Sequence, residues 1–394
     1  MNQSLQKLSE IAAKKERIIL GLMSGTSADG LDISLSKISG AGFNTSVSLL
    51  EFSSIAYTEE FKSDFQSKLF GATLPLVFMM RMQQRVQKEW VRLIKKQLRD
   101  WEVIPVDIDL IASHGQTVLH NPSTGKMSAS THQIVDGDYL AENIGIITIS
   151  DFRQKHIAAG FEGAPLAPLA EQLIFSGVKK PVIMLNLGGI ANFTMLEEEK
   201  KSPSLPFSTD AGPANTLIDA AVRKYFKDDT YDHFGEFAAK GKTFHGLLEA
   251  LKTHPFFSFD APKSTGPEEF TFDWVESEMK RSKFNGSPED LISTLTEFSA
   301  WGIAGEIKKK FVDRELDVYV SGGGWHNHTL MLNLKKELPK CRFHSSKKLG
   351  IDPDAKEAIL FSVLANETVA GEGFEYKSTS GKLKKLNLGK ISLP

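Results

Sequence analysis

The 394-residue sequence contains one cysteine, Cys341, so no disulfide can form within the chain and nothing indicates an oxidising compartment. No apolar run approaches the ~20 residues of a membrane-spanning helix. An excess of one charge is also missing, because the formal net charge is only -2. These absences argue against a membrane or nucleic-acid partner, and any bound anion must be held by local structure.

The chain is long and has the composition of an ordinary soluble globular protein. Hydrophobic residues make up 41% and charged residues 24%. A chain of this length exceeds one comfortable hydrophobic core, which predicts two domains. Residues 1–17 are polar with sparse apolar positions, which predicts a short amphipathic helix and not a signal peptide. Cytoplasmic location is the resulting expectation.

The stretch 18–35 organises the rest of the chain. An apolar run meets a small polar turn and resumes with alternation, which predicts a β-hairpin. Gly25 and Gly30 permit backbone angles closed to other residues, so the turn can aim several N–H groups at one anion. Its hydroxyl groups come from Ser24, Thr26 and Ser27.

Two aspartates, Asp29 and Asp32, follow this turn. Carboxylates beside a phosphate cradle are explained if Mg²⁺ sits between them and the phosphate, because that ion prefers oxygen ligands. A solvated hairpin tip is the alternative, and the loop composition alone does not decide between the two.

Polar residues follow two further strands predicted in the first half. The strand 106–112 ends in a segment that carries His114 and Gln116, although a lone histidine there could be structural. The strand 146–149 leads into Asp151 and Arg153. These two side chains could bind a polar ligand or each other, and an ion pair between them is the favoured interpretation from the residues alone.

The second half repeats the opening pattern. Strands at 182–187 and 190–196 flank Gly188 and Gly189. Two glycine-turned hairpins predict duplicated halves that face each other across a cleft, although each turn could be simple hairpin chemistry.

Asp210 is the candidate general base. It follows a predicted strand at 206–209 and precedes a predicted helix at 215–226, with Pro213 in the first turn. The helix amino terminus would favour the ionised carboxylate. A capping or turn aspartate is the commoner outcome for such a segment.

Other candidates are weaker. Lys263 lies in the polar loop 262–266 and could contact a phosphate, although a surface lysine is commoner. A strand at 317–320 precedes a glycine triplet that permits close approach of a ligand. Three further elements are predicted: a helix at 291–311, a helix at 354–365 that carries Glu357, and a basic, turn-rich tail from about residue 377, which lies against one lobe or is partly disordered. The triplet consists of Gly322, Gly323 and Gly324.

The glycine turns and the aspartates are what ATP-dependent phosphoryl transfer requires. A second observation is more specific: seven motifs, in order, resemble those of the anhydro-N-acetylmuramic acid kinase family from about residue 18 to 370. They are the segments 22–32, 113–117, 151–153, 186–192, 210–215, 262–266 and 353–358.

This resemblance implies an α/β fold of the actin, hexokinase and Hsp70-like ATPase superfamily, with two RNase H-like lobes and a nucleotide cleft between them. We expect an N-terminal lobe of 1–150 plus 366–394 and a C-terminal lobe of 151–365. The resemblance assigns the two glycine hairpins and the triplet to ATP binding. It implies a cytoplasmic homodimer, a sugar substrate, and the cofactors ATP and Mg²⁺.

The resemblance also implies the reaction. Water attacks C1 of 1,6-anhydro-N-acetylmuramic acid, the anhydro bridge opens, and the released O6 takes the γ-phosphoryl group, giving N-acetylmuramate 6-phosphate and ADP in cell-wall sugar recycling. Asp210 matches the family's water-activating base. Possible sugar-side residues are His114, Gln116, Asp151, Arg153 and Glu357.

The sequence departs from the family pattern at several positions, which bear on sugar preference more than on ATP use. Alternatives are therefore a kinase or hydrolase for another sugar in the superfamily, or a non-catalytic ATP-binding module of the actin or chaperone type. The departures are Ala28 for leucine, Val135 and Ala214 for glycine, His156 for aspartate, and Phe161-Glu162 for a Gly-Gln pair.

Overall fold

The chain forms two compact units in the computed structural model. Unit 1 comprises Met1–Gly177, Glu199–Leu205 and Asp354–Pro394, and unit 2 comprises Val178–Glu198 and Pro206–Pro353. The structure describes residues 2–25, 28–62, 75–121, 123, 127–197, 206–311, 314–377 and 383–394.

These units differ in extent from the predicted lobes. Residues 151–177 and 354–365, which we expected in the C-terminal lobe, belong to unit 1 by their contacts. The second of these stretches holds the start of a helix that packs along the unit 1 sheet.

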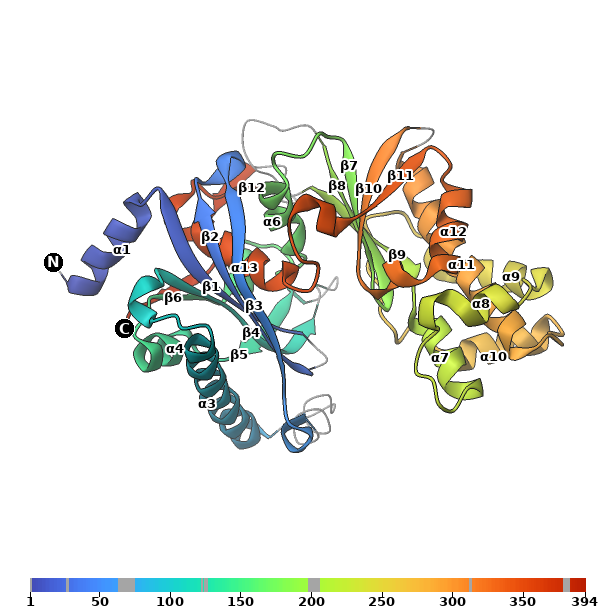
Figure 1. Ribbon diagram of the computed structural model, residues 1–394, viewed down its shortest axis with the longest axis horizontal. Helices are drawn as coiled ribbons and strands as arrows, with labels where there is room; N and C mark the ends of the chain where they lie inside the picture. Colours follow the sequence, from blue (N-terminus) through green and yellow to red (C-terminus); the bar gives the residue numbers. More distant parts are fainter. Residues whose placement is uncertain are drawn as a thin grey trace. The chain divides into compact units, whose positions relative to one another are not determined.

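Unit 1 is built on one mixed sheet with helices on both faces (Figure 1). The sheet order is β3-β2-β1-β4-β6-β14, with β5 paired to β4. The strands are β1 (Glu16–Ser24), β2 (Gly30–Ser39), β3 (Ser46–Ala56), β4 (Leu110–Asn121), β5 (Ser130–Ile134), β6 (Thr148–Ser150) and β14 (Lys390–Ser392), and β12 (Phe374–Lys377) and β13 (Leu383–Leu386) form a separate hairpin. The helices are α1 (Gln3–Ala13), α3 (Leu76–Asp100), α4 (Gly137–Ile144), α5 (Phe152–Ala158), α6 (Ala167–Ile174) and α13 (Lys356–Ala370).

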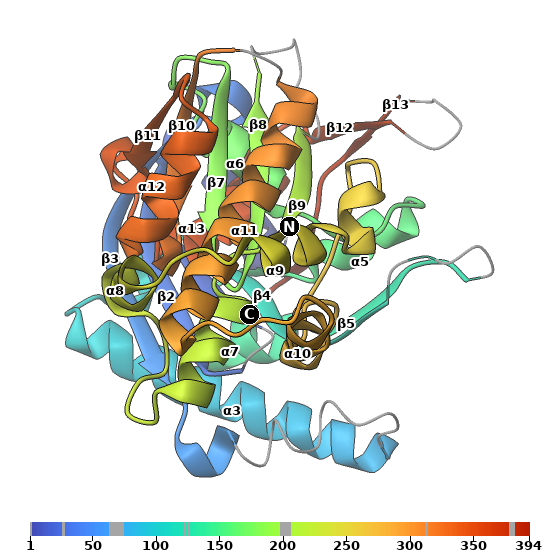
Figure 2. The ribbon, with the colours of Figure 1, turned by 90° about the vertical axis from the view of Figure 1, so that its right-hand side faces the viewer.

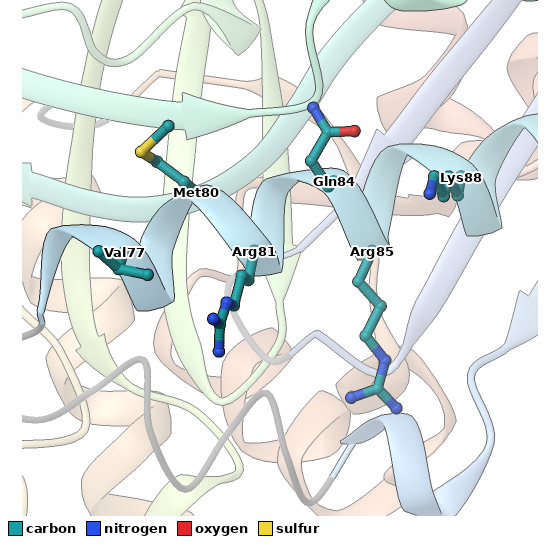
Figure 3. Close-up of a pocket in the computed structure, with 6 residues that line it drawn as sticks. All are labelled: Val77, Met80, Arg81, Gln84, Arg85 and Lys88. Carbon is teal, nitrogen blue, oxygen red and sulfur yellow. The ribbon is translucent and has the colours of Figure 1, made fainter.

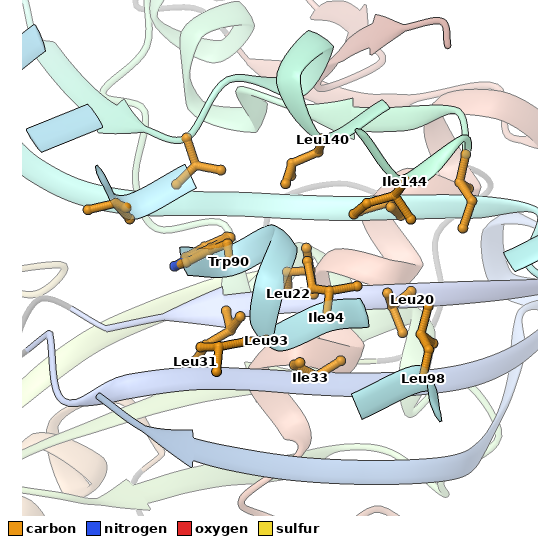
Figure 4. Packing of buried hydrophobic residues seen from close by; sticks show 14 of the residues in the cluster. Leu20, Leu22, Leu31, Ile33, Trp90, Leu93, Ile94, Leu98, Leu140 and Ile144 are labelled. Carbon is orange, nitrogen blue, oxygen red and sulfur yellow. The ribbon is translucent and has the colours of Figure 1, made fainter. Parts of the chain in front are cut away.

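The alternation of β1 decides which helix covers which face. Leu20 and Leu22 point to the face that α3 covers, where Trp90 is fully buried (Figure 4). Gly21 points to the opposite face, where a Cβ would lie 2.1 Å from the Ala358 carbonyl oxygen. The missing side chain therefore lets α13 lie against β1, with its first turn close to the sheet.

Unit 2 repeats this sheet in the order β9-β8-β7-β10-β11. Helices α11 and α12 lie along it (Figure 2), and a second apolar core fills the space between α7, α9, α10 and the first half of α11. The strands are β7 (Val182–Leu187), β8 (Ile190–Leu196), β9 (Phe207–Pro213), β10 (Leu316–Ser321) and β11 (Cys341–Ser345). The helices are α7 (Thr216–Tyr225), α8 (Glu236–Lys240), α9 (His245–Lys252), α10 (Phe272–Arg281), α11 (Pro288–Lys310) and α12 (His328–Glu337).

Both units share one topology. In each, the first three strands pair antiparallel, a later strand joins parallel to the first (β4 in unit 1, β10 in unit 2), and another joins parallel to that one (β6 and β11). Unit 1 adds β5, which pairs antiparallel with β4. The shared arrangement is that of an RNase H-like lobe. The predicted α/β fold class with two duplicated lobes is therefore confirmed, including the hairpin of β7 and β8.

Two predicted strands have the wrong bounds. The strand expected at 106–112 is β4, which runs to Asn121, and the strand expected at 206–209 is β9, which runs to Pro213. In the predicted basic tail, residues 390–392 form β14, which pairs antiparallel with β6, so this part of the tail lies against unit 1, as one of the two alternatives predicted. Within the described residues, no helix is long and apolar enough to cross a membrane.

Candidate active site

The first candidate half-site lies in unit 1, at the turn between β1 and β2. Gly25, Asp29 and Gly30 are described there, whereas Thr26 and Ser27 lie outside the described residues. The N–H of Ala28 donates to the Gly25 carbonyl over 3.1 Å, which closes a tight turn. The predicted glycine hairpin is therefore present where the sequence placed it.

The side chain of Gln116 holds this turn in place through hydrogen bonds. Its amide nitrogen donates to the Gly25 carbonyl over 2.8 Å, and its oxygen lies 2.6 Å from the Ser24 hydroxyl. Tyr57 and Trp90 extend the network, since the Trp90 indole donates to the Tyr57 hydroxyl over 2.6 Å. Gln116 is fully buried. We had expected it to contact the sugar, but the structure places it as a support of the loop.

A bulge in β4 produces this arrangement. Two steps along β1, from Leu22 to Ser24, match three steps along β4, from Ser113 to Gln116. Gly115 takes a φ of 77° in the extra step, a backbone angle that favours glycine. Sequence patterns located the polar residues but gave no signal of the bulge that orients them.

The two loop aspartates have different surroundings. Asp29 is exposed and its carboxylate lies 3.1 Å from the Lys62 ammonium. Asp32 is half-buried, and burial raises its pKa, with a smaller contribution from the negative charge of Asp354. A carboxylate in that environment gains more from a bound cation than one already paired with lysine.

The carboxylates of this half-site suit a Mg²⁺ ion that takes most of its ligands from phosphate and water. Among the described residues, no group of three or more His, Cys, Asp or Glu side chains is placed to hold a metal ion. Mg²⁺ commonly takes one or two carboxylates from a protein and fills its remaining positions with phosphates and water. Asp32 fits that mode.

His114 and Arg153 form the second part of the unit 1 half-site. The Arg153 Nε donates to His114 Nε2 over 3.0 Å, and its Nη1 donates to the Gly163 carbonyl over 3.0 Å. Burial, together with the nearby positive charge of Arg153, lowers the pKa of His114 to about 3. The imidazole is therefore neutral and accepts at Nε2. No described residue accepts a hydrogen bond from Arg153 Nη2.

The expected ion pair between Asp151 and Arg153 does not form. Asp151 instead lies 2.9 Å from the Lys390 ammonium on β14, an element 239 residues away in sequence. Asp151 also takes a left-handed backbone conformation at the start of α5. Spacing along the chain could not reveal this partner, because it is brought in by the sheet.

Glu357 lies in the first turn of α13, and its side chain contacts solvent. Partial desolvation by the surrounding protein raises its pKa, and the Asp32 carboxylate raises it further. Glu357 thus belongs to the same acidic environment as Asp32.

Most departures from the family pattern lie in unit 1, and two of them contact each other. The His156 and Phe161 rings stack with centroids 4.9 Å apart, and Glu162 accepts the Ser123 N–H over 2.8 Å. His156 Nδ1 accepts the Gly163 N–H over 2.9 Å, so it orders the residue that binds Arg153. Val135 holds a φ of 90°, an unusual angle for a β-branched residue.

We expect His156→Leu to destabilise the protein by about 1–3 kcal/mol, because the buried Gly163 N–H loses its acceptor. His156→Asn, whose amide oxygen can replace ring Nδ1, should cost less. Urea unfolding measures both. Equal losses for the two variants would show that the acceptor contributes nothing.

The pH dependence gives a second check. Burial lowers the pKa of His156 from 6.5 to about 4, so the unfolded chain binds this proton first as the pH falls. The wild type should therefore lose stability relative to His156→Asn between about pH 6.5 and pH 4.

Three segments meet in unit 2 to form the second half-site. The turn at Gly188 and Gly189 joins β7 to β8, and Asn215 Nδ2 donates to the Gly188 carbonyl over 2.7 Å. The N–H of Ala214 donates to the Gly189 carbonyl over 2.8 Å. Ala214, which stands where the family commonly has glycine, is buried and has no positive φ, so this change is accommodated without backbone strain.

The glycine triplet packs against the end of β7, directly before the same turn. A Cβ on Gly322 would lie 2.6 Å from the Leu187 carbonyl oxygen, and one on Gly324 would lie 2.7 Å from the Leu187 Cβ. Gly323 has open space around it. Side chains at Gly322 and Gly324 would push the two loops apart, which explains why glycine is needed there.

Asp210 lies within β9, opposite Asn192 of β8. Its carboxylate accepts the Thr265 N–H over 2.8 Å. Burial raises its pKa, and the Thr265 N–H acts in the opposite direction. The predicted position ahead of a helix was wrong, because α7 begins only at Thr216 and Pro213 ends the strand.

Lys263 is held inside unit 2. Its ammonium donates to the Phe256 carbonyl over 2.8 Å, to the Phe259 carbonyl over 3.0 Å and to Glu306 over 2.9 Å. Three acceptors use all three of its hydrogens. The expected contact between Lys263 and a substrate is therefore not supported by its surroundings.

A hollow of about 610 Å³ on α3 lies apart from the predicted site residues (Figure 3). Its lining mixes apolar and basic side chains, namely Val77, Met80, Arg81, Gln84, Arg85 and Lys88.

The duplicated RNase H-like sheet, with a glycine turn after each first strand, is the architecture expected of the actin, hexokinase and Hsp70-like ATPase superfamily. The family model described as anhydro-N-acetylmuramic acid kinase matches residues 17–394. The chain therefore belongs to the anhydro-N-acetylmuramic acid kinase family.

Curated relatives carry the same name. The protein from Pseudoalteromonas atlantica is 40% identical over 100% of both chains, and that from Pseudoalteromonas translucida is 40% identical over 100% of this chain and 99% of its own. The protein from Caldanaerobacter subterraneus is 35% identical over 99% of this chain and 100% of its own.

Among solved structures, (R)-2-hydroxyglutaryl-CoA dehydratase component A from Acidaminococcus fermentans is 12% identical, with a TM-score of 0.44 over 90% of this chain and 99% of that chain. This similarity is too weak to bear on function.

Proposed function

We propose that this protein is an ATP-dependent kinase of 1,6-anhydro-N-acetylmuramic acid that yields N-acetylmuramate 6-phosphate and ADP in cell-wall sugar recycling. The observation that carries the proposal is the family match over residues 17–394, together with 40% identity to a curated kinase across both whole chains. ATP is the phosphoryl donor of such a kinase.

Asp210 is proposed as the general base. Its carboxylate takes a proton from water while the water oxygen bonds to C1, and the bond from C1 to O6 breaks. The released O6 then bonds to the γ-phosphorus of ATP, and ADP leaves. Burial makes the Asp210 carboxylate a stronger base, and the Thr265 N–H keeps it oriented.

The glycine turns are proposed to bind the nucleotide through main-chain N–H groups. In unit 2 the close packing of Gly322 and Gly324 on Leu187, directly before the Gly188–Gly189 turn, supports this, because it brings two glycine-rich segments of main chain together. In unit 1 the proposed residues are Gly25, Thr26, Ser27, Asp29, Gly30 and Asp32.

Arg153 is proposed to bind the acidic lactyl group of the sugar. Its Nε and Nη1 are held by His114 and Gly163, and Nη2 has no acceptor among the described residues. Neutral His114 adds no second positive charge. A guanidinium fixed in this way suits recognition of a carboxylate.

Asp32 is proposed to be the aspartate that would hold Mg²⁺. The bound ion would neutralise phosphate charge. Asp32→Asn should raise the Mg²⁺ concentration for half-maximal rate by about tenfold to a hundredfold. Asp29→Asn is the matched control and should change it little, because Asp29 is exposed and paired with Lys62. The reverse ranking in a Mg²⁺ titration would assign the metal to Asp29.

The test of function uses the anhydro sugar, ATP and Mg²⁺ in ¹⁸O-labelled water, with products read by mass spectrometry. The proposal requires ¹⁸O at C1 of a 6-phosphorylated product and one ADP per sugar. An unlabelled phosphorylated product would indicate an ordinary sugar kinase. A labelled product without phosphate would indicate a hydrolase, and ATP binding without any product would indicate a non-catalytic module.

A cytoplasmic homodimer is proposed from the family resemblance. Light scattering on the purified protein tests the dimer, with a mass of about twice 43.6 kDa expected. A mass of 43.6 kDa at all concentrations would contradict it.

A further inference from the structure

One buried ion pair in unit 2 includes Lys263, whose main-chain carbonyl accepts the Asp210 N–H. The ammonium of Lys263 is 2.9 Å from Glu306 on α11, and the side chains are 7% and 1% exposed. A charged pair is costly to bury, and replacing it with apolar residues is often neutral or stabilising. Stability alone therefore does not explain why this pair is present.

The main chain of Lys263 joins the pair to β9. The Asp210 N–H donates to the Lys263 carbonyl over 2.9 Å, and the Lys263 N–H donates to the Thr209 hydroxyl over 3.0 Å. The loop 262–266 is thus bonded to the strand on which Asp210 lies. Two residues later the same loop presents the Thr265 N–H that the Asp210 carboxylate accepts.

The position of that N–H depends on how firmly the loop is held. Lys263 is bonded through its ammonium to α11 and to the carbonyls of Phe256 and Phe259. The ammonium also lies 4.1 Å from the centroid of the Phe256 ring. All these contacts lie within unit 2. The side chain of Lys263 joins the helix α11 to the segment 256–259, and its main chain joins both to the strand β9.

We propose that Glu306 and Lys263 are positioning residues for the reaction, which hold the loop 262–266 so that the Thr265 N–H is aimed at the Asp210 carboxylate. Neither side chain touches substrate in this role. The inference rests on the proposed function of Asp210, and it replaces the sequence-based expectation that Lys263 binds substrate.

The test compares Glu306→Gln with the double variant Lys263→Met/Glu306→Leu. The single variant weakens the bond to Lys263, and the double variant replaces the buried pair with apolar groups of similar volume, so it should remain folded. In both we expect kcat to fall about tenfold. In the pH–rate profile, kcat should begin to fall at a pH about one unit higher on the acidic side (the acid limb). The reason is that Asp210 loses a hydrogen bond that favours its charged form.

Lys309→Met is the matched control. Lys309 also binds Glu306, over 2.8 Å, but it is 51% exposed and does not belong to the loop. Its kcat and acid limb should equal those of the wild type. A double variant that is folded and keeps the wild-type kcat and acid limb would overturn the inference.

Hydrogen exchange at the Thr265 amide separates this inference from the proposed function, because it needs no turnover. We expect faster exchange in the double variant than in Lys309→Met. If the wild type does not phosphorylate the anhydro sugar, the proposed function fails whatever the exchange shows. If the wild type is active but exchange and acid limb are unchanged in the double variant, only the positioning role fails.

Discussion

Asp210→Asn is expected to lower kcat about a thousandfold, within the range that general base catalysis contributes. The substitution keeps the size of the side chain, and the amide oxygen can still accept the Thr265 N–H that Asp210 accepts over 2.8 Å. What is lost is the ability to take a proton from water. Steady-state rates in the coupled ADP assay measure this, and the KM for ATP should change little.

Asp317→Asn is the control for removal of a carboxylate from unit 2. Asp317 lies on β10 and is bonded to Arg342 and His344, and mainly the bond to Arg342 lowers its pKa to about 2. We expect lower stability and an unchanged kcat. A kcat of Asp210→Asn within about threefold of the wild type would contradict the assignment of the base, since even the weakest general base contributes more.

Arg153→Met should lower kcat/KM for 1,6-anhydro-N-acetylmuramic acid by about tenfold to a hundredfold, because a hydrogen bond to a charged group is worth about 1.5–3 kcal/mol. The methionine retains much of the apolar stem. The comparison substrate is 1,6-anhydro-N-acetylglucosamine, which lacks the lactyl carboxylate. Its kcat/KM should be nearly the same in wild type and variant.

Arg342→Met provides the matched control, since Arg342 is 60% exposed and binds Asp317 on the surface of unit 2. It should leave both substrates unaffected. Equal losses for the two sugars in Arg153→Met would mean that Arg153 does not recognise the carboxylate. In that case its bonds to His114 and Gly163 would be purely structural.

The sequence predicted the hairpins best, because their signal is local. Alternating apolar residues on either side of a glycine turn are enough to specify two antiparallel strands, and β7 and β8 have the predicted bounds. The duplication followed from finding that pattern twice. The family resemblance rested on short motifs that each lie within one turn or strand end.

Partners distant in the sequence were not predictable in this way. Nothing near Gln116 indicated that a bulge would turn it beneath the Gly25 turn, and nothing near Asp151 pointed to Lys390. Trp90 is buried in the core of unit 1, and its indole N–H also supports the loop by donating to the Tyr57 hydroxyl.

Asp210 illustrates what the sequence determines and what the tertiary structure determines. The sequence by itself determined which residue is the candidate base, because the motif around it is specific and contiguous. Only the tertiary structure decided its surroundings: a position within β9, a raised pKa through burial, and a hydrogen bond from Thr265, which lies 55 residues away. The physical reason is that burial and hydrogen bonding depend on chain segments brought together by folding, whereas the motif depends only on neighbours along the chain.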